Sequence, residues 1–236
     1  MSSPVHRFAL IPAAGSGARF GGGLPKQYAA LAGEPLLKRT IAAVSAAPAL
    51  DAIFVVLARD DSWYRQQVGS IVGIEPLYCG GETRAESVRN ALAAIGNQAV
   101  ADDWILVHDA ARPCIDAEAL TRLLRELDDD PVGGLLALPV ADTLKRADGG
   151  ACPRVAATEP RDGLWCAQTP QMFRYAMLDR AYREADLATI TDEAQAIEAL
   201  GAKPRLVMGS PANIKVTFPD DLALAEAILT QRRSTP

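Results

Sequence analysis

The chain has 236 residues, of which 49% are hydrophobic and 22% are charged, and its formal net charge is −5. This size and apolar content suit one large α/β domain and argue against a disordered chain. Because the charge balance is acidic and no basic stripe is present, we expect no nucleic-acid partner.

Apolar segments that fit buried strands alternate with amphipathic segments that fit helices. We predict strands at residues 8–11, 53–57, 104–107 and 135–138, and helices at about 35–47, 84–95 and 117–127. Such an alternation is typical of an α/β fold with a mostly parallel sheet that helices cover on both faces. Ligands of these sheets bind beyond the carboxyl ends of the strands.

Residues 140–167 break this alternation with several glycines and prolines and only short extended segments. We interpret them as a β-arm that projects from the domain, with a surface loop as the alternative. A lone two-stranded arm is marginally stable in water, so we expect this arm to pack against a second subunit. Beyond Thr169 we predict helices at 174–185 and 192–200, a strand at 205–207 and a closing helix at 219–231. No linker or repeat divides the chain, which favours a single domain over residues 1–236.

The cysteines and the apolar runs bear on the compartment. Cys79, Cys114, Cys152 and Cys166 lie far apart without a C-x-x-C pair, which favours free thiols over a zinc site or a disulfide framework. The first apolar strand begins at Phe8, so we expect no signal or transit peptide. No apolar run approaches the roughly 18 residues that a membrane-spanning helix needs. These features predict a cytoplasmic protein that is not inserted in a membrane.

The loop after the first strand carries the strongest functional signal. It leaves the strand at Pro12 on small residues, and the cations Arg19 and Lys26 follow. Backbone amides combined with two cations suit a triphosphate. The P-loop pattern G-x-x-x-x-G-K-[ST] is absent, and a dinucleotide-binding loop needs a small residue where Phe20 stands. The loop therefore predicts nucleotide chemistry of another kind, with a purely structural glycine turn as the alternative.

A second polar segment directly follows the strand predicted at 104–107. Asp109 lies at the carboxyl end of that strand, where its oxygens can hold Mg²⁺ close to a phosphate-binding loop. Arg112 can clamp a phosphate with its planar fork. A helix cap is the alternative role for Asp109, and His108 is better interpreted as a hydrogen-bonded structural histidine than as a base.

Weaker signals lie in two further places. The glycine pair before Glu82 permits close backbone approach, and Glu82 and Ser87 can contact a base or a ribose, although a helix start explains that segment equally well. The other polar candidates lie in loops or in the arm, and each is ordinary surface when taken alone: Thr143, Lys145, Arg161, Thr169 and Lys215.

Several strings of residues, in chain order, resemble one known family. They are P-A-A-G-S-G-A-R-F-G with P-K-Q-Y, G-G-E-T-R-A-E-S-V, V-H-D-A-A-R-P, A-D-T-L-K, L-W-C-A-Q-T-P-Q, T-I-T-D-E, and N-I-K-V-T followed by P-D-D-L. Each is only suggestive, but together and in this order they are specific. Over nearly its full length the chain resembles the 2-C-methyl-D-erythritol 4-phosphate cytidylyltransferase family.

The resemblance implies a fold and an activity. The implied fold is a Rossmann-like three-layer nucleotidyltransferase fold with a projecting β-arm. The implied reaction joins CTP to 2-C-methyl-D-erythritol 4-phosphate, with a divalent cation such as Mg²⁺, and releases pyrophosphate in the non-mevalonate isoprenoid pathway. The family is homodimeric, and its arm contributes to the neighbouring site.

The resemblance also implies a role for each matching residue. The catalytic cations are expected to be Arg19, Lys26, Arg161 and Lys215. The residues expected to bind CTP are Pro12, Ala13, Ala14, Gly15, Ser16, Gly17, Gly80, Gly81, Glu82, Ser87 and Ala110. The residues expected to bind the second substrate are Asp109, Arg112, Thr143, Arg161, Thr169 and Lys215, and Asp109 is also expected beside the metal. Phe20 stands where Met is common in the family, and Glu82 stands where Asp or another residue occurs, which leaves the cytosine contact less defined.

Two other functions are compatible with parts of this pattern. A cytidylyltransferase for another polyol phosphate, such as ribitol 5-phosphate, would share the nucleotide-binding half. A protein that binds CTP without turnover would share the loop, but it would not need Arg19, Lys26, Asp109 and Lys215 together.

Overall fold

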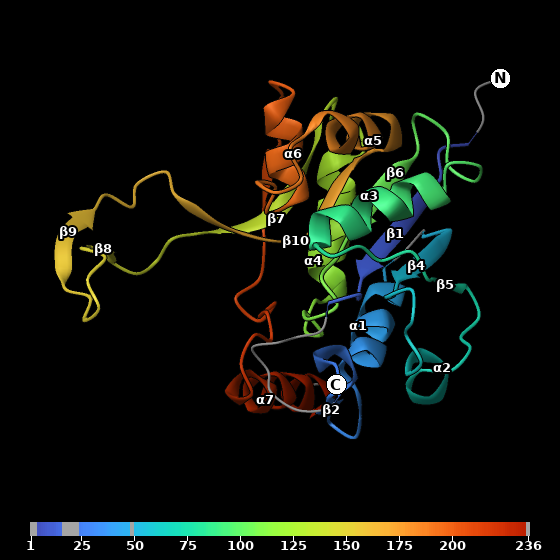
Figure 1. Ribbon diagram of the computed structural model, residues 1–236, viewed down its shortest axis with the longest axis horizontal. Helices are drawn as coiled ribbons and strands as arrows, with labels where there is room; N and C mark the ends of the chain where they lie inside the picture. The colour runs from blue at the N-terminus through green and yellow to red at the C-terminus, as the bar shows by residue number, and fades with distance from the viewer. Residues whose placement is uncertain (1–3, 16–23, 48–49, 235–236) are drawn as a thin grey trace.

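The computed structural model describes residues 4–15, 24–47 and 50–234, and its centre is a seven-stranded sheet (Figure 1). From edge to edge the strands are β11 (Arg205–Met208), β7 (Gly133–Pro139), β10 (Trp165–Arg174), β6 (Trp104–Val107), β1 (Arg7–Pro12), β4 (Ala52–Val56) and β5 (Ile74–Leu77). Strand β10 runs antiparallel to both of its neighbours, and the other pairings are parallel. The predicted mostly parallel sheet is therefore confirmed.

Alternating side chains of β1 show why the sheet needs a helical layer on each face. Ala9 and Ile11 belong to one buried apolar cluster, and Phe8 and Leu10 belong to the other. The first cluster contains side chains of α1 (Leu36–Ser45), α2 (Tyr64–Gln67) and α4 (Ala117–Leu127). The second contains side chains of α3 (Arg84–Ala94), α5 (Tyr175–Glu184) and α6 (Glu193–Ala199). A strand buried on both faces has to be apolar where it is buried, as β6 and residues 8–11 of β1 are.

A short hairpin and the C-terminal helix lie beside the sheet on the side where its parallel strands end. The short hairpin of β2 (Ala30–Leu31) and β3 (Glu34–Pro35) follows the single-turn helix at Lys26–Tyr28. Helix α7 (Asp220–Ser234) packs near this hairpin, and Leu31 shares a small apolar cluster with Ala225 of α7 (Figure 1). No helix in the described part of the chain is both long and apolar enough to cross a membrane.

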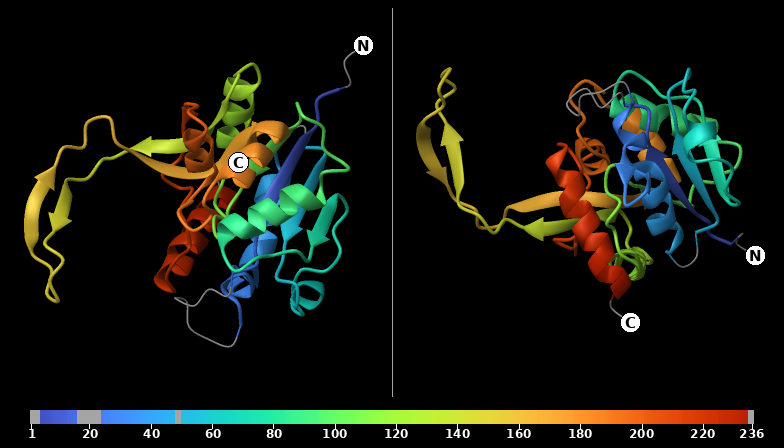
Figure 2. Two further views of the ribbon diagram at one scale, coloured as in Figure 1. Left: turned by 45° about the horizontal axis from the view of Figure 1, so that its top comes forward. Right: turned by 90° about the horizontal axis from the view of Figure 1, so that it is seen from below.

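A two-stranded antiparallel sheet projects away from the three layers. It consists of β8 (Leu144–Ala147) and β9 (Val155–Glu159), and extended segments connect it to β7 and β10. All three views show this arm clear of the helices (Figures 1 and 2). The arm predicted at residues 140–167 ends earlier than expected, because residues 165–167 pair with β7 inside the central sheet.

Two strands of the central sheet were not predicted from the sequence. Strand β10 contains Pro170 and three polar residues in its middle, so it lacks the apolar run that marked the other central strands. Strand β5 contains Pro76, and proline is tolerated there because β5 is an edge strand.

Candidate active site

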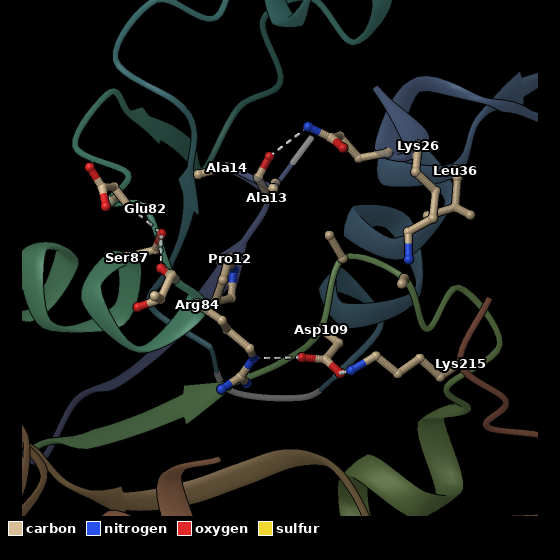
Figure 3. A pocket seen from close by; sticks show the side chains of 16 residues that line it. Pro12, Ala13, Ala14, Lys26, Leu36, Glu82, Arg84, Ser87, Asp109 and Lys215 are labelled. Atoms are coloured by element: carbon tan, nitrogen blue, oxygen red, sulfur yellow. Dashed lines mark hydrogen bonds and ion pairs between the residues drawn. The ribbon is translucent and has the colours of Figure 1, made fainter. Parts of the chain in front are cut away.

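The main pocket opens beyond the carboxyl ends of β1 and β6, as expected for an open sheet of this kind. Figure 3 shows its side chains converging from β1, from the start of α3 and from two loops. Its lining residues are Pro12, Ala13, Ala14, Gly15, Lys26, Gln27, Leu36, Gly81, Glu82, Thr83, Arg84, Ser87, Asp109, Ala110, Ala111 and Lys215. Most of the residues predicted to bind CTP thus line one cavity.

The turn before α3 is held tightly against the end of β1. The Gly80 amide donates to the carbonyl of Leu57 at 2.8 Å. A Cβ on Gly80 would collide with the Cβ of Ala14, so only glycine permits this approach. The hydroxyl of Ser87 accepts the Gly81 amide proton at 3.1 Å and donates to the Thr83 carbonyl at 2.9 Å. Ser87 therefore shapes the turn in this structure.

The segment that carries Lys26 is tied to two other parts of the pocket. The Gln27 side chain donates to the Ala13 carbonyl at 2.7 Å and is buried. The ammonium of Lys26 donates to the carbonyl of Val216 at 2.8 Å. Lys215 is the neighbour of Val216, so these contacts bring the two predicted catalytic lysines to the same side of the pocket.

Asp109 is the electrostatic centre of the pocket wall (Figure 3). Its Oδ1 accepts from Arg84 Nε at 2.9 Å, and its Oδ2 lies 2.8 Å from Lys215 Nζ and 3.7 Å from Arg112 Nε. Burial alone raises the pKa of a carboxyl, but here the charges of Arg84 and Lys215 outweigh it and hold the pKa of Asp109 well below its usual range. Asp109 is therefore ionised, and its role as a helix cap is excluded because Asp116 caps the following helix.

Arg84 is the main site residue that the sequence interpretation missed. Its Nη1 and Nη2 donate to the two carboxylate oxygens of Glu193 at 2.7 and 3.0 Å, while its Nε donates to Asp109. Glu193 is fully buried. Both residues lie inside the strings G-G-E-T-R and T-I-T-D-E, so the resemblance contained them. Their partnership spans 109 positions of the chain, and residue types alone do not reveal it.

A second cavity lies on the other side of Asp109. It shares Arg84, Asp109 and Lys215 with the main pocket, and its remaining lining residues are Arg112, Ala167, Gln168, Thr169, Gln171, Thr191 and Asp192. Arg112 and Thr169, predicted to bind the second substrate, are in this cavity. Arg112 Nη1 donates to the Asn213 carbonyl at 2.7 Å, and its buried Nε has no hydrogen-bond partner.

His108 precedes Asp109 in the chain, and its hydrogen bonds indicate a structural role. Its Nε2 lies 3.1 Å from the carbonyl of Arg112, and its Nδ1 lies 3.1 Å from the hydroxyl of Thr169. Only an Nε2–H can donate to that carbonyl, so Nδ1 accepts from Thr169, whose oxygen in turn accepts the Asp109 amide proton at 3.0 Å. Burial lowers the pKa of His108 to about 4, which keeps the ring neutral near pH 7.

Among the described residues, the two predicted site residues on the arm do not line these cavities. Thr143 and Arg161 are exposed on the arm, where the guanidinium of Arg161 donates to the carbonyl of Ala141. Ser16, Gly17 and Arg19 lie outside the described residues.

The acidic side chains of the main pocket do not make a magnesium site by themselves. Glu82 and Asp109 are the carboxylates in its described lining, and both oxygens of Asp109 already accept from cations. Among the described residues, no group of three potential metal-ligating acids, histidines or cysteines gathers anywhere. Direct ligation by Asp109 would place the metal ion beside oxygens that already accept from Arg84 and Lys215, so the cation would meet two neighbouring positive charges.

Comparisons with known proteins agree over the whole chain. The family model described as 2-C-methyl-D-erythritol 4-phosphate cytidylyltransferase matches residues 7–231. A protein of that name from Dechloromonas aromatica (strain RCB) is 57% identical over 98% of this chain and 100% of its own length. Another from Azoarcus sp. (strain BH72) is 56% identical over 97% of this chain and 96% of its own length.

Solved structures show the same similarity. The crystal structure of a 4-diphosphocytidyl-2C-methyl-D-erythritol synthase is 38% identical, with a TM-score of 0.85 over 96% of this chain and 100% of that one. The Francisella tularensis 2-C-methyl-D-erythritol 4-phosphate cytidylyltransferase is 35% identical, with a TM-score of 0.80 over 94% of this chain and 99% of that one.

Proposed function

The chain belongs to the 2-C-methyl-D-erythritol 4-phosphate cytidylyltransferase family, and we propose that its two adjoining cavities hold the two substrates of that reaction. The enzyme joins CTP to 2-C-methyl-D-erythritol 4-phosphate, forming 4-diphosphocytidyl-2-C-methyl-D-erythritol and pyrophosphate. In the proposal, CTP occupies the main pocket and the 4-phosphate of the acceptor occupies the cavity of Arg112 and Thr169. The observation that carries this assignment is the wall of Arg84, Asp109 and Lys215, which both cavities share.

The proposed transfer is an in-line displacement at the α-phosphorus of CTP. An oxygen of the acceptor phosphate forms the new P–O bond, and the bond from the α-phosphorus to the bridging oxygen breaks. The electron pair of the broken bond leaves with pyrophosphate. A phosphate monoester is already ionised near neutral pH, so no general base is needed, and the neutral, buried His108 is consistent with this.

Catalysis then depends on positioning and on charge neutralisation. In the proposal, Lys26 and Arg19 bind the triphosphate, and Lys215 and Arg112 bind the attacking phosphate. Lys215 suits this role because its ammonium lies at the boundary of the two cavities, held there by Asp109. Arg161 and Thr143 are proposed to reach the acceptor of a neighbouring subunit from the arm.

The divalent ion expected from the sequence is proposed to enter with CTP, held mainly by phosphate oxygens. When bound it would neutralise part of the triphosphate charge. The engaged oxygens of Asp109 favour this arrangement over a site built by the protein. Direct ligation by Asp109 predicts that Asp109→Asn raises the Mg²⁺ concentration needed for half-maximal turnover, whereas ligation by the nucleotide predicts no change in it.

A homodimer is proposed from two exposed features. Within the described part of the chain, β8 and β9 pair with each other and join the central sheet through their connecting segments, and Val155 on β9 is 65% exposed. Near its base, the edge strand β11 exposes Leu206 by 44% and Met208 by 46%. A second copy would cover both features, and sedimentation or light scattering would measure its mass.

A cytoplasmic location stays a proposal as well. Its support is the set of free cysteines, Cys79, Cys114, Cys152 and Cys166, which suits a reducing compartment. Fractionation of cells that express the tagged chain would test it, and recovery in an extracytoplasmic or membrane fraction would contradict it.

Pyrophosphate release tests the reaction directly. Each nucleoside triphosphate would be assayed against a panel of polyol phosphates that includes ribitol 5-phosphate. We expect release with CTP and 2-C-methyl-D-erythritol 4-phosphate only. Release with ribitol 5-phosphate alone would favour the other polyol specificity, and CTP binding without any release would indicate a nucleotide-binding protein.

A further inference from the structure

Glu193 is a fully buried carboxylate that neither cavity contains. It is the first residue of α6, and the strand β10 fixes that helix start on both sides of it. The side chain of Gln171 makes both contacts: its Nε2 donates to Asp192 Oδ2 at 3.0 Å, and its Oε1 accepts the Ala194 backbone amide proton at 2.7 Å. Asp192 also caps the helix through the Gln195 amide. The backbone of Glu193 is therefore placed by the central sheet.

The carboxylate of Glu193 fixes the plane of one guanidinium. Its two oxygens accept from the two terminal nitrogens of Arg84, and Tyr182 donates its hydroxyl to Oε1 at 2.9 Å. A bidentate pair of this kind sets orientation as well as distance. A buried charge also needs such a partner, so the contact has a structural function in any case.

The orientation that results has a chemical consequence at the pocket. With its terminal nitrogens bound to Glu193, Arg84 has its Nε facing Asp109 Oδ1 at 2.9 Å. Asp109 can then present Oδ2 to Lys215 at 2.8 Å. These contacts connect the core of the helical layer, residue by residue, to the boundary of the two cavities.

We propose that Glu193 is a positioning residue for the cytidylyl transfer, which holds Arg84 so that Asp109 and Lys215 keep their places at the wall between nucleotide and acceptor. This inference rests on the proposed function, because it takes the roles of Asp109 and Lys215 from there. Loss of Glu193 would leave both substrates able to bind but would misplace the groups around the reacting phosphates. Misplacement by about 1 Å can cost roughly a hundredfold in rate.

The first test is Glu193→Gln, which keeps the size of the side chain and removes its charge. We expect kcat to fall about 10- to 100-fold, with the KM for CTP changing less than about threefold. The matched control is Glu198→Gln, the same change on the exposed side of the same helix, which should leave kcat unchanged. Full turnover by folded Glu193→Gln would overturn the inference.

A double-mutant cycle compares Glu193→Gln with Asp109→Asn, because a purely structural defect would add its own loss of turnover to that of Asp109→Asn. If Glu193 acts through Asp109, the double variant should lose no more turnover than Asp109→Asn alone. Losses that multiply would overturn the inference. Should Glu193→Gln fail to fold, Tyr182→Phe replaces it, with an expected twofold to fivefold loss of kcat, on the order of one weakened hydrogen bond. Unchanged kcat in folded Tyr182→Phe would then be the contradicting result.

The same cycle separates this inference from the proposed function. Normal turnover by Asp109→Asn would contradict the role proposed for Asp109, whatever Glu193→Gln does. A large loss in Asp109→Asn beside full turnover in Glu193→Gln would contradict the positioning role alone.

Discussion

The pocket wall and the arm both carry polar side chains assigned to the reaction, but the chain holds them in opposite ways. At the wall, Asp109 is 7% exposed and is surrounded by three cations from three different segments. On the arm, Thr143 and Arg161 are exposed, and the guanidinium of Arg161 donates to the Ala141 carbonyl of the arm itself. The wall is organised by the fold of a single chain, whereas that fold leaves these two arm residues exposed and outside the lining of both cavities.

The ion pairs of the two regions also differ in strength, because those at the wall are buried and the pair on the arm is screened by solvent. Arg84 has its three guanidinium nitrogens bound to buried carboxylates, where removal of either partner leaves an uncompensated charge. Arg146 and Glu159 form an ion pair across the arm, but solvent screens it, and such pairs contribute about 0 to 1 kcal/mol. Substitutions at the wall should therefore change chemistry strongly, and single substitutions within the arm should hardly change its stability.

The largest expected effect is at Lys26, on the nucleotide side of the wall. Lys26→Ala removes a fixed ammonium from the pocket, and loss of one well-placed charged donor commonly costs about 3 kcal/mol, or about a hundredfold in rate. We expect kcat for pyrophosphate release to fall at least that far while the melting temperature stays near that of the unchanged protein. Lys38→Ala is the control, because Lys38 pairs with Glu34 away from the pocket lining. Near-normal turnover by Lys26→Ala would remove its assigned role.

The next effect tests whether the arm serves a neighbouring subunit. Arg161→Ala and Lys26→Ala proteins should each be nearly inactive alone. If the arm acts across a dimer, random mixing of the two should restore about a quarter of the normal activity, because half of the dimers then contain one intact site. Co-expression followed by the pyrophosphate assay measures this. Absence of any recovery in verified mixed dimers would place Arg161 in the site of its own chain.

The same contrast explains what the sequence could predict. Asp109 lines the pocket, and its position could be predicted because it lies just after an apolar strand and the carboxyl ends of parallel strands meet at one edge of the sheet. The loops around Gly80 and Lys26 could be predicted because glycine permits close backbone approach and lysine supplies a positive charge. These are local signals, and a single sequence carries them.

Long-range partnerships carry no such local signal. Glu193 was quoted within a matching string, yet nothing near it in the chain indicates that it binds Arg84. Strand β10 was missed because Pro170 and its glutamines resemble a loop, although neighbours on both sides bury it. The end of the arm was placed too late for the same reason, since residues 165–167 gain their strand partners only from β7.

A smaller effect is expected in the pH dependence of stability, to which the two histidines of the chain contribute differently. The pKa of His108 is lowered to about 4 by burial, so the unfolded chain binds a proton more readily than the folded one between about pH 6.5 and 4. The contribution of the neutral His108 ring to the free energy of unfolding is present in full above pH 6.5 and is lost as the pH falls towards 4. Between pH 7 and pH 4.5 this loss amounts to about 2 to 3 kcal/mol. Urea unfolding at both pH values should show that loss in the unchanged protein but not in His108→Gln.

His6 provides the matched control, because it is only partly buried and its pKa is raised by the hydrogen bond with Asp51. Its protonation favours the folded state, so acidification through its pKa carries no such penalty. His6→Gln should therefore keep the acid-dependent loss that His108→Gln lacks. Equal pH dependence in the unchanged protein and in His108→Gln would contradict the buried neutral state of His108.

The smallest expected effect is a difference in stability between alanine substitutions at two glycines near the pocket, Gly80 and Gly15. A Cβ on Gly80 would lie 2.7 Å from the Leu57 carbonyl oxygen and would also collide with Ala14, whereas a Cβ on Gly15 would meet no atom of the described residues within 4 Å. Gly80→Ala should thus lower the free energy of unfolding by about 1 to 2 kcal/mol through overpacking. Gly15→Ala should leave stability unchanged, so any defect must appear as a higher KM for CTP. Denaturant unfolding and CTP titration of both variants measure this, and equal stability of Gly80→Ala and the unchanged protein would show that the turn does not depend on the close approach.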